Sequence, residues 1–380
     1  MHHSEQMKQE AGKQLLYRLA ITMVPGVGGA TAKKLLAACE SPEAVFREPA
    51  RNLVKIPGIG QHIAGKVSGF RDFGRAEKEI AFIQKYGIRA IFHTDPEYPE
   101  RLRQCADGPL LLFVKGPADL HARKVVAVVG TRNMSPYGRK KCREIVEGMI
   151  PHNVLVVSGL AYGVDACAHK VAMDCGLQTV AVLGHGLDRV YPATHADLAK
   201  SILEKGGLVS DFPTGTAPDR ENFPKRNRII AGISDAVVVV EAAITGGALI
   251  TAMIANTYHR DVFALPGRTT DPYSMGCNKL IKSHQAHLIE SAADLEFVMN
   301  WEPFSENRQG VQARIFPPLS REETVVAKCL KEHSEPDIDT VSQETGLTTA
   351  RTTALLLNME LKGVVEQLPG KRYTLCAGHT

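Results

Sequence analysis

Short runs rich in valine alternate with longer stretches of helical periodicity between residues 122 and 290. Continuous β-branched runs of four or five residues are typical of strands that are buried on both faces, as in a parallel sheet covered by helices. The runs are Val125–Val129, Val154–Val157, Thr179–Leu183, Ala236–Val240 and Val262–Leu265. This alternation predicts an α/β domain with a parallel sheet over residues 122–299, and no other feature constrains the fold as strongly.

The sequence on either side of this domain has a different character. Apolar residues recur at helical spacing over residues 1–75 and are interrupted by Pro-Gly turns, which predicts a helical domain. We expect residues 76–121 to form a connecting segment that leads into the central domain. Residues 300–318 contain several prolines and are expected to be a linker. A chain of 380 residues is long enough for this number of domains.

The last part of the chain, residues 319–380, predicts a winged-helix domain. Helical patterns over 338–345 and 348–361 are separated by Gly346-Leu347, and a Pro-Gly pair divides two short strand-like runs after them. Within residues 348–361 the only cation is Arg351, so we expect only a weak DNA or protein contact there.

The helical region contains an internal repeat. A hydrophobic-Pro-Gly-hydrophobic-Gly turn precedes a predicted helix at 24–28 and again at 56–60. Glycines permit a tight turn and a close phosphate, and the following helix offers free N–H groups and a positive dipole end. The repeat looks like two helix-hairpin-helix motifs of a SAM-like domain, although such turns can serve helix packing alone. A secondary DNA-binding site would contain Gly26, Gly28, Lys33, Gly58 and Gly60.

Glycine-rich loops follow four of the predicted strands. Ligands of open parallel sheets bind outside the carboxyl ends of the strands, and loops of this kind can surround an anion with backbone N–H groups. Neither G-x-G-x-x-G after the first strand nor a P-loop motif is present, which argues against a dinucleotide site or a P-loop NTPase. The candidate DNA-binding residues in these loops are Gly130, Thr131, Arg132, Ser158, Gly159, Gly163, Gly246 and Gly247.

A basic segment at residues 220–228, expected just before a helix, surrounds Phe223 with four cations. Single strands need positive charge for their phosphates and a flat apolar face for an unstacked base. The candidate residues are Arg220, Phe223, Lys225, Arg226, Asn227 and Arg228. The alternative is that Phe223 packs in the core and the arginines pair with Glu221 or Asp235.

The distribution of charge favours an anionic partner, although the formal net charge is only +4. Residues 1–75 hold eleven basic and six acidic side chains, and residues 121–143 hold seven basic and no acidic ones. Eight scattered cysteines form no C-x-x-C pair, so we expect reduced thiols, no disulfide framework and no metal. The N-terminus carries no apolar signal core and no apolar run could span a membrane, so we expect a cytoplasmic protein.

Successive motifs over residues 93–290 resemble the bacterial DNA-processing protein A (DprA/Smf) family. They are Gly-Thr-Arg at 130–132, Ser-Gly-x-Ala-x-Gly-x-Asp at 158–165, Gly-x-Gly-x-Asp at 184–188, Phe-Pro-x-Arg-Asn-Arg at 223–228, and Gly-Ala-Leu-Ile-Thr-Ala at 247–252. The sequence departs from the family pattern at Cys277, at Ser283-His284 and at Arg220. The resemblance implies a Rossmann-like central domain whose DNA pocket falls on Gly130, Arg132, Ser158, Gly159, Arg220, Phe223, Arg226 and Arg228.

The same resemblance implies a function. A family member would bind single-stranded DNA without catalysis or a cofactor, displace single-strand-binding protein, and load RecA recombinase during natural transformation. It also implies a homodimer formed through the central domain.

Two enzymatic hypotheses and one regulatory hypothesis compete with this one. Ser158, Asp165 and His169 could form a catalytic arrangement, although no G-x-S-x-G elbow is present and we favour a helix-capping Asp and a structural His. Glu241 beside a Thr-Gly-Gly loop suggests a Rossmann-type nucleotide hydrolase. A duplex-DNA-binding regulator could instead act through the second helix of the winged helix.

Overall fold

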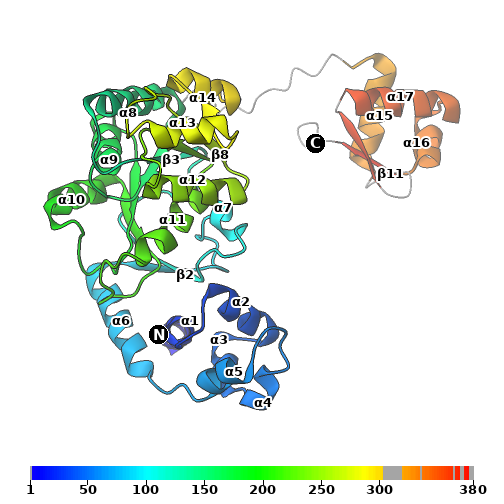
Figure 1. The fold of residues 1–380 in the computed structure, drawn as a ribbon. Coiled ribbons are helices and arrows are strands. Elements are labelled where there is room, and N and C mark those ends of the chain that lie inside the picture. The colour runs from blue at the N-terminus through cyan, green and yellow to red at the C-terminus, as the bar shows by residue number, and fades with distance from the viewer. Residues whose placement is uncertain (1, 303–318, 334–335, 363, 369–371, 376–380) are drawn as a thin grey trace. The chain divides into compact units, whose positions relative to one another are not determined.

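A computed structural model describes residues 2–302, 319–333, 336–362, 364–368 and 372–375 of the chain. The chain divides into two compact units, Met1–Phe304 and Ser305–Thr380, and each is described here by itself (Figure 1). None of the helices in the described ranges combines the length and the apolar character that a membrane span requires.

The first unit is built on one sheet of nine strands among the described residues. In spatial order the strands are β1 (Arg89–Phe92), β2 (Leu111–Lys115), β6 (Gly207–Ser210), β5 (Thr179–Val182), β4 (Leu155–Ser158), β3 (Val125–Val129), β7 (Ala236–Val239), β8 (Asp261–Ala264) and β9 (His287–Leu288). Strands β6 to β9 in this order pair in parallel, whereas β1 and β2 are antiparallel to their neighbours. The predicted α/β class is confirmed, and the central sheet is mostly parallel, with an antiparallel pair at one edge.

Helices cover both faces of this sheet (Figure 1). Val125, Ala127 and Val129 face a core that includes residues of α7 (Glu100–Arg103), α11 (Asn222–Ile233) and α12 (Gly247–Thr257). Val126 and Val128 face the opposite core, with α8 (Pro136–Gly148), α9 (Val164–Asp174) and α14 (Ala292–Val298). Successive strand residues point to opposite faces, so a run of valines is buried throughout only when both faces are covered. The remaining helical elements here are α10 (Ala196–Lys205), α13 (Met275–Lys282), η1 (Ile150–His152) and η2 (Ala193–His195).

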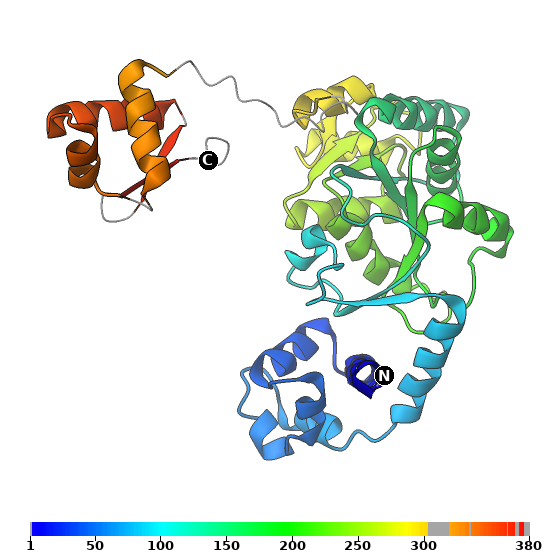
Figure 2. The same cartoon turned by 180° about the vertical axis from the view of Figure 1, so that it is seen from behind.

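The N-terminal helices pack against the antiparallel edge of the sheet (Figure 2). They are α1 (His2–Met23), α2 (Gly29–Ala38), α3 (Pro42–Arg47), α4 (Ala50–Leu53), α5 (Gln61–Ser68) and α6 (Phe73–Tyr86). Their core contains Leu19, Leu35 and Val67, and it continues into Phe92 of β1 and Phe113 of β2. The helical domain and the sheet edge therefore share one apolar cluster.

The second unit has the element order of a winged helix. It contains α15 (Arg321–Glu332), α16 (Ile338–Thr345), α17 (Thr349–Leu361) and the antiparallel pair β10 (Val365–Leu368) and β11 (Arg372–Leu375). Val326, Leu356 and Met359 lie in a core of its own. Gly346 ends α16 in the left-handed conformation, with φ of 67°, which glycine adopts without strain.

The structure differs from two sequence-based expectations and does not describe most of the segment that a third one concerns. The segment 76–121 supplies β1 and β2, so the sheet begins before the expected boundary at residue 122. The basic segment expected before a helix lies largely inside one, because α11 begins at Asn222 and its first turn tolerates Pro224. Most of the expected linker, residues 303–318, lies outside the described residues.

Candidate nucleic-acid interface

A pocket of about 280 Å³ opens at the carboxyl ends of β3 and β7. Strand order reverses at β3, because β4 lies on one side of it and β7 on the other. Loops diverge at such a point and leave a crevice in which ligands of open α/β sheets bind. The lining residues are Val129, Gly130, Thr131, Arg132, Ala161, Asp165, Phe223, Arg226, Asn227, Ile230, Ala242, Ala243, Gly246, Gly247, Ala248 and Thr251.

Arg132 and Phe223 combine charge and an aromatic face at the pocket. Arg132 is exposed, and its guanidinium carbon lies 5.5 Å from the centre of the Phe223 ring. It makes no ion pair with any acidic side chain of the described residues. Phe223 is half-buried and lines the pocket instead of packing wholly into the core. An unpaired guanidinium beside a partly exposed ring suits a phosphate and a base.

Arg226 is the buried cation of the pocket, with 5% of its surface exposed. Its Nη1 donates to the carbonyls of Gly159, at 2.7 Å, and Val182, and its Nε donates to Asn227 Oδ1 at 3.2 Å. Burial lowers the pKa of this guanidinium to about 10, a shift that Asp165 opposes, so the side chain stays charged at neutral pH. Carbonyl partners fix the guanidinium in place without cancelling its charge.

Glycines let the pocket loops approach one another. A Cβ on Gly159 would lie 2.6 Å from the Arg226 guanidinium, and Gly163, with φ of 77°, lies against the carbonyl of Thr131. Gly246 caps α12 without any side-chain hydrogen bond, so the first backbone N–H groups of that helix are not capped by a side chain. These N–H groups begin beside the pocket-lining Gly247, and a helix N-terminus of this kind attracts anions.

Several predicted site residues lie outside this pocket. The Ser158 hydroxyl is buried and donates to the carbonyl of Val128 at 2.6 Å. Arg228 pairs with Asp211 at 2.7 Å and donates to the carbonyl of Asp107. Arg220 and Lys225 are exposed near the pocket on α11 or just before it, but they do not line it.

Thr251 is a lining residue that the sequence-based site omits. It lies one turn after Gly247 on α12 and is buried. Side chains four residues apart share a helix face, so this position could have been inferred from the Gly-Gly pair that precedes α12.

The candidate catalytic groups make structural hydrogen bonds, although Asp165 also lines the pocket. Asp165 lies in the first turn of α9, where Gly163 is the cap, and accepts the N–H groups of Gly159 and Ala161 at 3.2 and 3.3 Å. His169 binds Thr179 Oγ1 at 2.7 Å, and burial lowers its pKa to about 3. The Ser158 side chain hydrogen-bonds to the Asp165 carboxyl, but His169 bonds to Thr179, so the structure does not complete the Ser-His-Asp arrangement. The expected helix-capping Asp binds the preceding loop instead.

Glu241 is turned away from the pocket. Its carboxylate accepts the N–H of Ser135 at 2.9 Å and the Ser135 hydroxyl, and only 1% of the residue is exposed. It therefore anchors the start of α8. Among the described residues, no group of three or more His, Cys, Asp or Glu side chains is placed to hold a metal ion.

Comparisons with known proteins agree with this architecture. A family model described as DNA recombination-mediator protein A matches residues 89–299, which is more than half of the chain. The chain belongs to this family. A DprA winged helix domain model matches residues 313–371, and a SAM-like helix-hairpin-helix tandem model matches residues 19–67.

Individual members of the recombination-mediator family align over most of the chain. Protein Smf of Synechocystis is 31% identical over 96% of this chain and 99% of the relative. Protein Smf of Escherichia coli is 39% identical over 77% of this chain and 79% of the relative. The crystal structure of DNA processing protein A from Streptococcus pneumoniae superposes with a TM-score of 0.65, at 34% identity over 76% of this chain and 99% of that one.

A structure of Helicobacter pylori DNA processing protein A, solved to describe its single-stranded DNA binding mode, shares the fold. Its TM-score is 0.52 and its identity is 24%, over 57% of this chain and 98% of that chain.

In the helix-hairpin-helix tandem of this family member, the glycine turn of each motif lies near a lysine of the other motif. Gly26 and Gly58 both adopt the left-handed conformation, with φ of 86° and 83°. A Cβ on Gly58 would lie 2.6 Å from Lys34 Nζ, and one on Gly26 would lie 3.8 Å from Lys66 Nζ. Each turn is thus close to the lysine of the other motif. Burial, and then the nearby charge of Arg228, lower the pKa of the predicted Lys33.

Proposed function

We propose that this family member binds single-stranded DNA at the pocket between β3 and β7 and acts by binding, without turnover of a substrate. The observation that carries this proposal is the position of Arg132 over Phe223, next to the uncapped N-terminus of α12. A phosphate would bind Arg132 and the α12 N–H groups, and the adjacent base would stack on the ring of Phe223. The Helicobacter pylori relative, whose single-stranded DNA binding mode has been described, supports it.

Arg226 would supply long-range attraction in this scheme. Its Nη1 and Nε groups donate to protein oxygens, which holds the guanidinium in place and keeps its charge beside the pocket. Gly26, Gly28, Gly58 and Gly60 of the helical domain would offer a secondary backbone contact, and exposed Arg220 and Lys225 would extend the positive surface beyond the pocket.

We further propose that the bound strand is protected, freed of single-strand-binding protein and delivered to RecA recombinase during natural transformation. Support comes from the family description, which names a recombination mediator. A mediator must hold the strand by its backbone so that recombinase can follow on any sequence, and phosphate contacts provide this.

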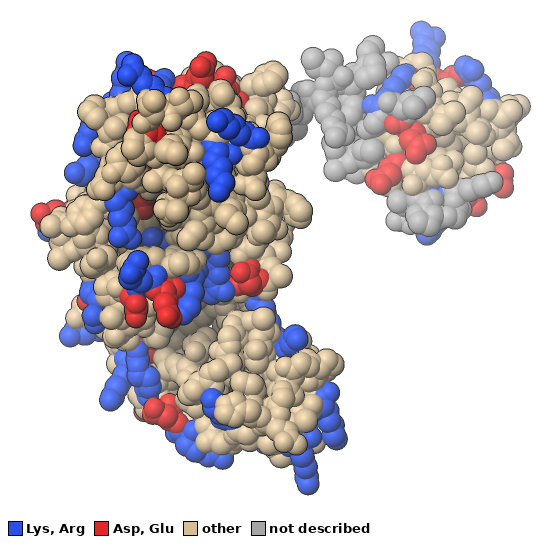
Figure 3. All heavy atoms as spheres, viewed as in Figure 1, with Lys and Arg blue, Asp and Glu red and all other residues tan. Residues whose placement is uncertain are grey.

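A homodimer through the central domain is part of the same proposal. Ile250 and Met253 on α12 are 41% and 58% exposed, and Leu288 on the edge strand β9 is 51% exposed. Helix α12 itself contains no charged residue, and Figure 3 shows uncharged surface beside the basic side chains of this region. Exposed apolar side chains on a face with an open sheet edge are typical of protein interfaces.

Anisotropy titrations with labelled single-stranded and duplex oligonucleotides over a salt series test this function. We expect tighter binding of the single strand, with an affinity that falls as salt rises. Parallel incubation with nucleoside monophosphates would detect turnover. Preference for the duplex, or turnover without oligonucleotide binding, would contradict the proposal.

A further inference from the structure

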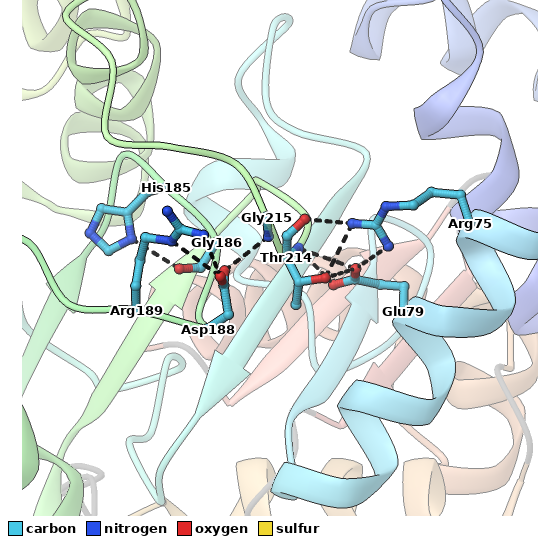
Figure 4. Close-up of polar contacts among 8 residues, drawn as sticks. All are labelled: Arg75, Glu79, His185, Gly186, Asp188, Arg189, Thr214 and Gly215. Carbon is cyan, nitrogen blue, oxygen red and sulfur yellow. Dashed lines mark hydrogen bonds and ion pairs between the residues drawn. The ribbon is translucent and has the colours of Figure 1, made fainter.

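The last helix of the helical domain is tied to a loop of the central domain by a buried carboxylate (Figure 4). Glu79 on α6 is only 1% exposed. It accepts hydrogen bonds from the backbone N–H of Thr214 at 3.0 and 3.1 Å and from the Thr214 hydroxyl at 2.6 Å. Arg75, one turn earlier, donates to Glu79 at 2.8 Å and to the Thr214 hydroxyl at 3.1 Å. Charge-assisted bonds in a buried setting hold Thr214 firmly on α6.

The loop that Glu79 holds is packed against a second loop, which follows β5. Asp188 accepts the N–H of Gly215 at 3.1 Å and is bound by Arg189 at 2.8 Å (Figure 4). The N–H of Gly186 donates to the carbonyl of Thr216 at 3.3 Å. A Cβ on Gly186 would lie 2.5 Å from the carbonyl oxygen of Pro213, so the two backbones are in direct contact. Residues 184–191 and 213–216 therefore pack directly against each other.

The loop after β5 reaches Phe223 directly. A Cβ on Gly184 would lie 3.1 Å from Cδ1 of the Phe223 ring, and the rings of Tyr191 and Phe223 have their centres 6.0 Å apart. Along the chain, the Asn222 side chain donates to the carbonyl of Ala217 at 3.2 Å, which links the loop to the first turn of α11. The ring is thus packed against the loop after β5, and the loop that Glu79 holds bonds both to that loop and to the residue before the ring.

An apolar contact runs beside this polar one. Leu187, in the loop after β5, packs both against the core of the helical domain and against the cluster that contains Ile202 of α10. Leu187 therefore holds the loop against both domains through an apolar contact that does not involve Glu79.

We propose that Glu79 is a positioning residue for the single-strand site: from the helical domain it fixes the loops that orient the Phe223 ring toward the pocket. This proposal rests on the proposed function, because it concerns the base-stacking half of that site. It assigns the helical domain a role in base stacking that is separate from any phosphate contact of its hairpins. Glu79 itself touches no DNA and acts through Thr214.

The test compares a labelled oligothymidylate with an abasic oligonucleotide of the same length. Glu79→Gln keeps the shape of the side chain and removes its charge. We expect it to weaken binding of the oligothymidylate about tenfold, as loss of one stacked base would, and to change abasic binding less than about twofold. The salt dependence should keep its slope, because no phosphate contact is lost.

Matched variants separate positioning from electrostatics and from folding. Glu77→Gln removes the same charge from an exposed position on α6 and should leave both affinities unchanged or slightly raised. Thr214→Val removes the hydroxyl and should act as Glu79→Gln does, whereas Thr214→Ser should restore binding. Equal losses for both oligonucleotides, or none for either, would overturn the positioning role. If the wild-type protein does not bind the single strand, the proposed function itself fails, which is a distinct result.

Discussion

The central pocket and the winged helix both present arginine on or near a helix that could approach nucleic acid, but the two regions use that charge differently. Arg132 has no ion pair with a described acidic side chain, and Arg226 is held by backbone carbonyls. In the winged helix, Arg351 on α17 pairs with Glu322 through two nitrogens at 2.6 and 3.0 Å. Lys362 pairs with Glu323 at 2.6 Å.

The difference shows that a cation can attract a ligand only when its own bonding partner leaves its charge uncompensated. Carbonyl acceptors orient a guanidinium and leave its positive charge to act on a ligand, whereas a carboxylate cancels the charge within a few ångströms. The central domain itself contains both cases, because Arg228 pairs with Asp211 and does not line the pocket. We therefore expect the pocket to dominate DNA binding and the winged helix to contribute little.

The largest expected effect is that of Arg132→Ala. Loss of a charge-assisted phosphate contact should weaken single-strand affinity by about tenfold to a hundredfold. It should also lower the log–log salt slope by about 0.7, the share of one single-strand phosphate. Anisotropy titrations at several salt concentrations measure both quantities. An unchanged slope would remove Arg132 from the phosphate contacts, and Arg228→Ala, a paired arginine nearby, is the matched control.

A smaller effect is expected for Phe223→Ala. Stacking of one base is worth about 1–3 kcal/mol, so affinity should fall by roughly tenfold while the salt slope stays constant. Phe223→Leu keeps most of the apolar volume and tests whether packing alone explains the loss. If leucine restores full affinity, the aromatic face is not a stacking surface and the pocket binds phosphate only.

The parallel core of the fold could be predicted from sequence because its signal is local. Five valine-rich runs correspond to β3, β4, β5, β7 and β8 within one or two residues. Strand β6, Gly207–Ser210, is short and begins with glycine, and the edge strand β1 has only four residues. Strand β2 lies between β1 and β6 and contains the continuous apolar run Leu111–Val114, so its signal is local and residues 76–121 should have been predicted to supply a strand.

The candidate site could be predicted only in part. The loops after β3 and β7 could be placed together because parallel strands end at a common edge. The roles of the arginines depend on partners that are distant in sequence: Arg226 meets the carbonyl of Gly159, and Arg228 meets Asp211. Spacing within residues 220–228 cannot reveal which of these arginines keeps its charge available.

The smallest expected effects are those of the winged-helix variants, which test whether an arginine paired with a carboxylate contributes little to DNA binding. Arg351→Ala should change single-strand affinity less than about twofold, because an exposed pair of this kind is worth only roughly 0.2–1 kcal/mol and its charge is already compensated. Glu322→Gln should leave Arg351 unpaired and raise duplex affinity slightly at low salt, with the gain lost near physiological salt as screening increases. Salt-series titrations of both variants with duplex and single-stranded oligonucleotides measure these changes. A tenfold loss of affinity for Arg351→Ala would show that Arg351 contributes to DNA binding although it pairs with Glu322. The pairing of a cation would then not explain the difference between the pocket and the winged helix.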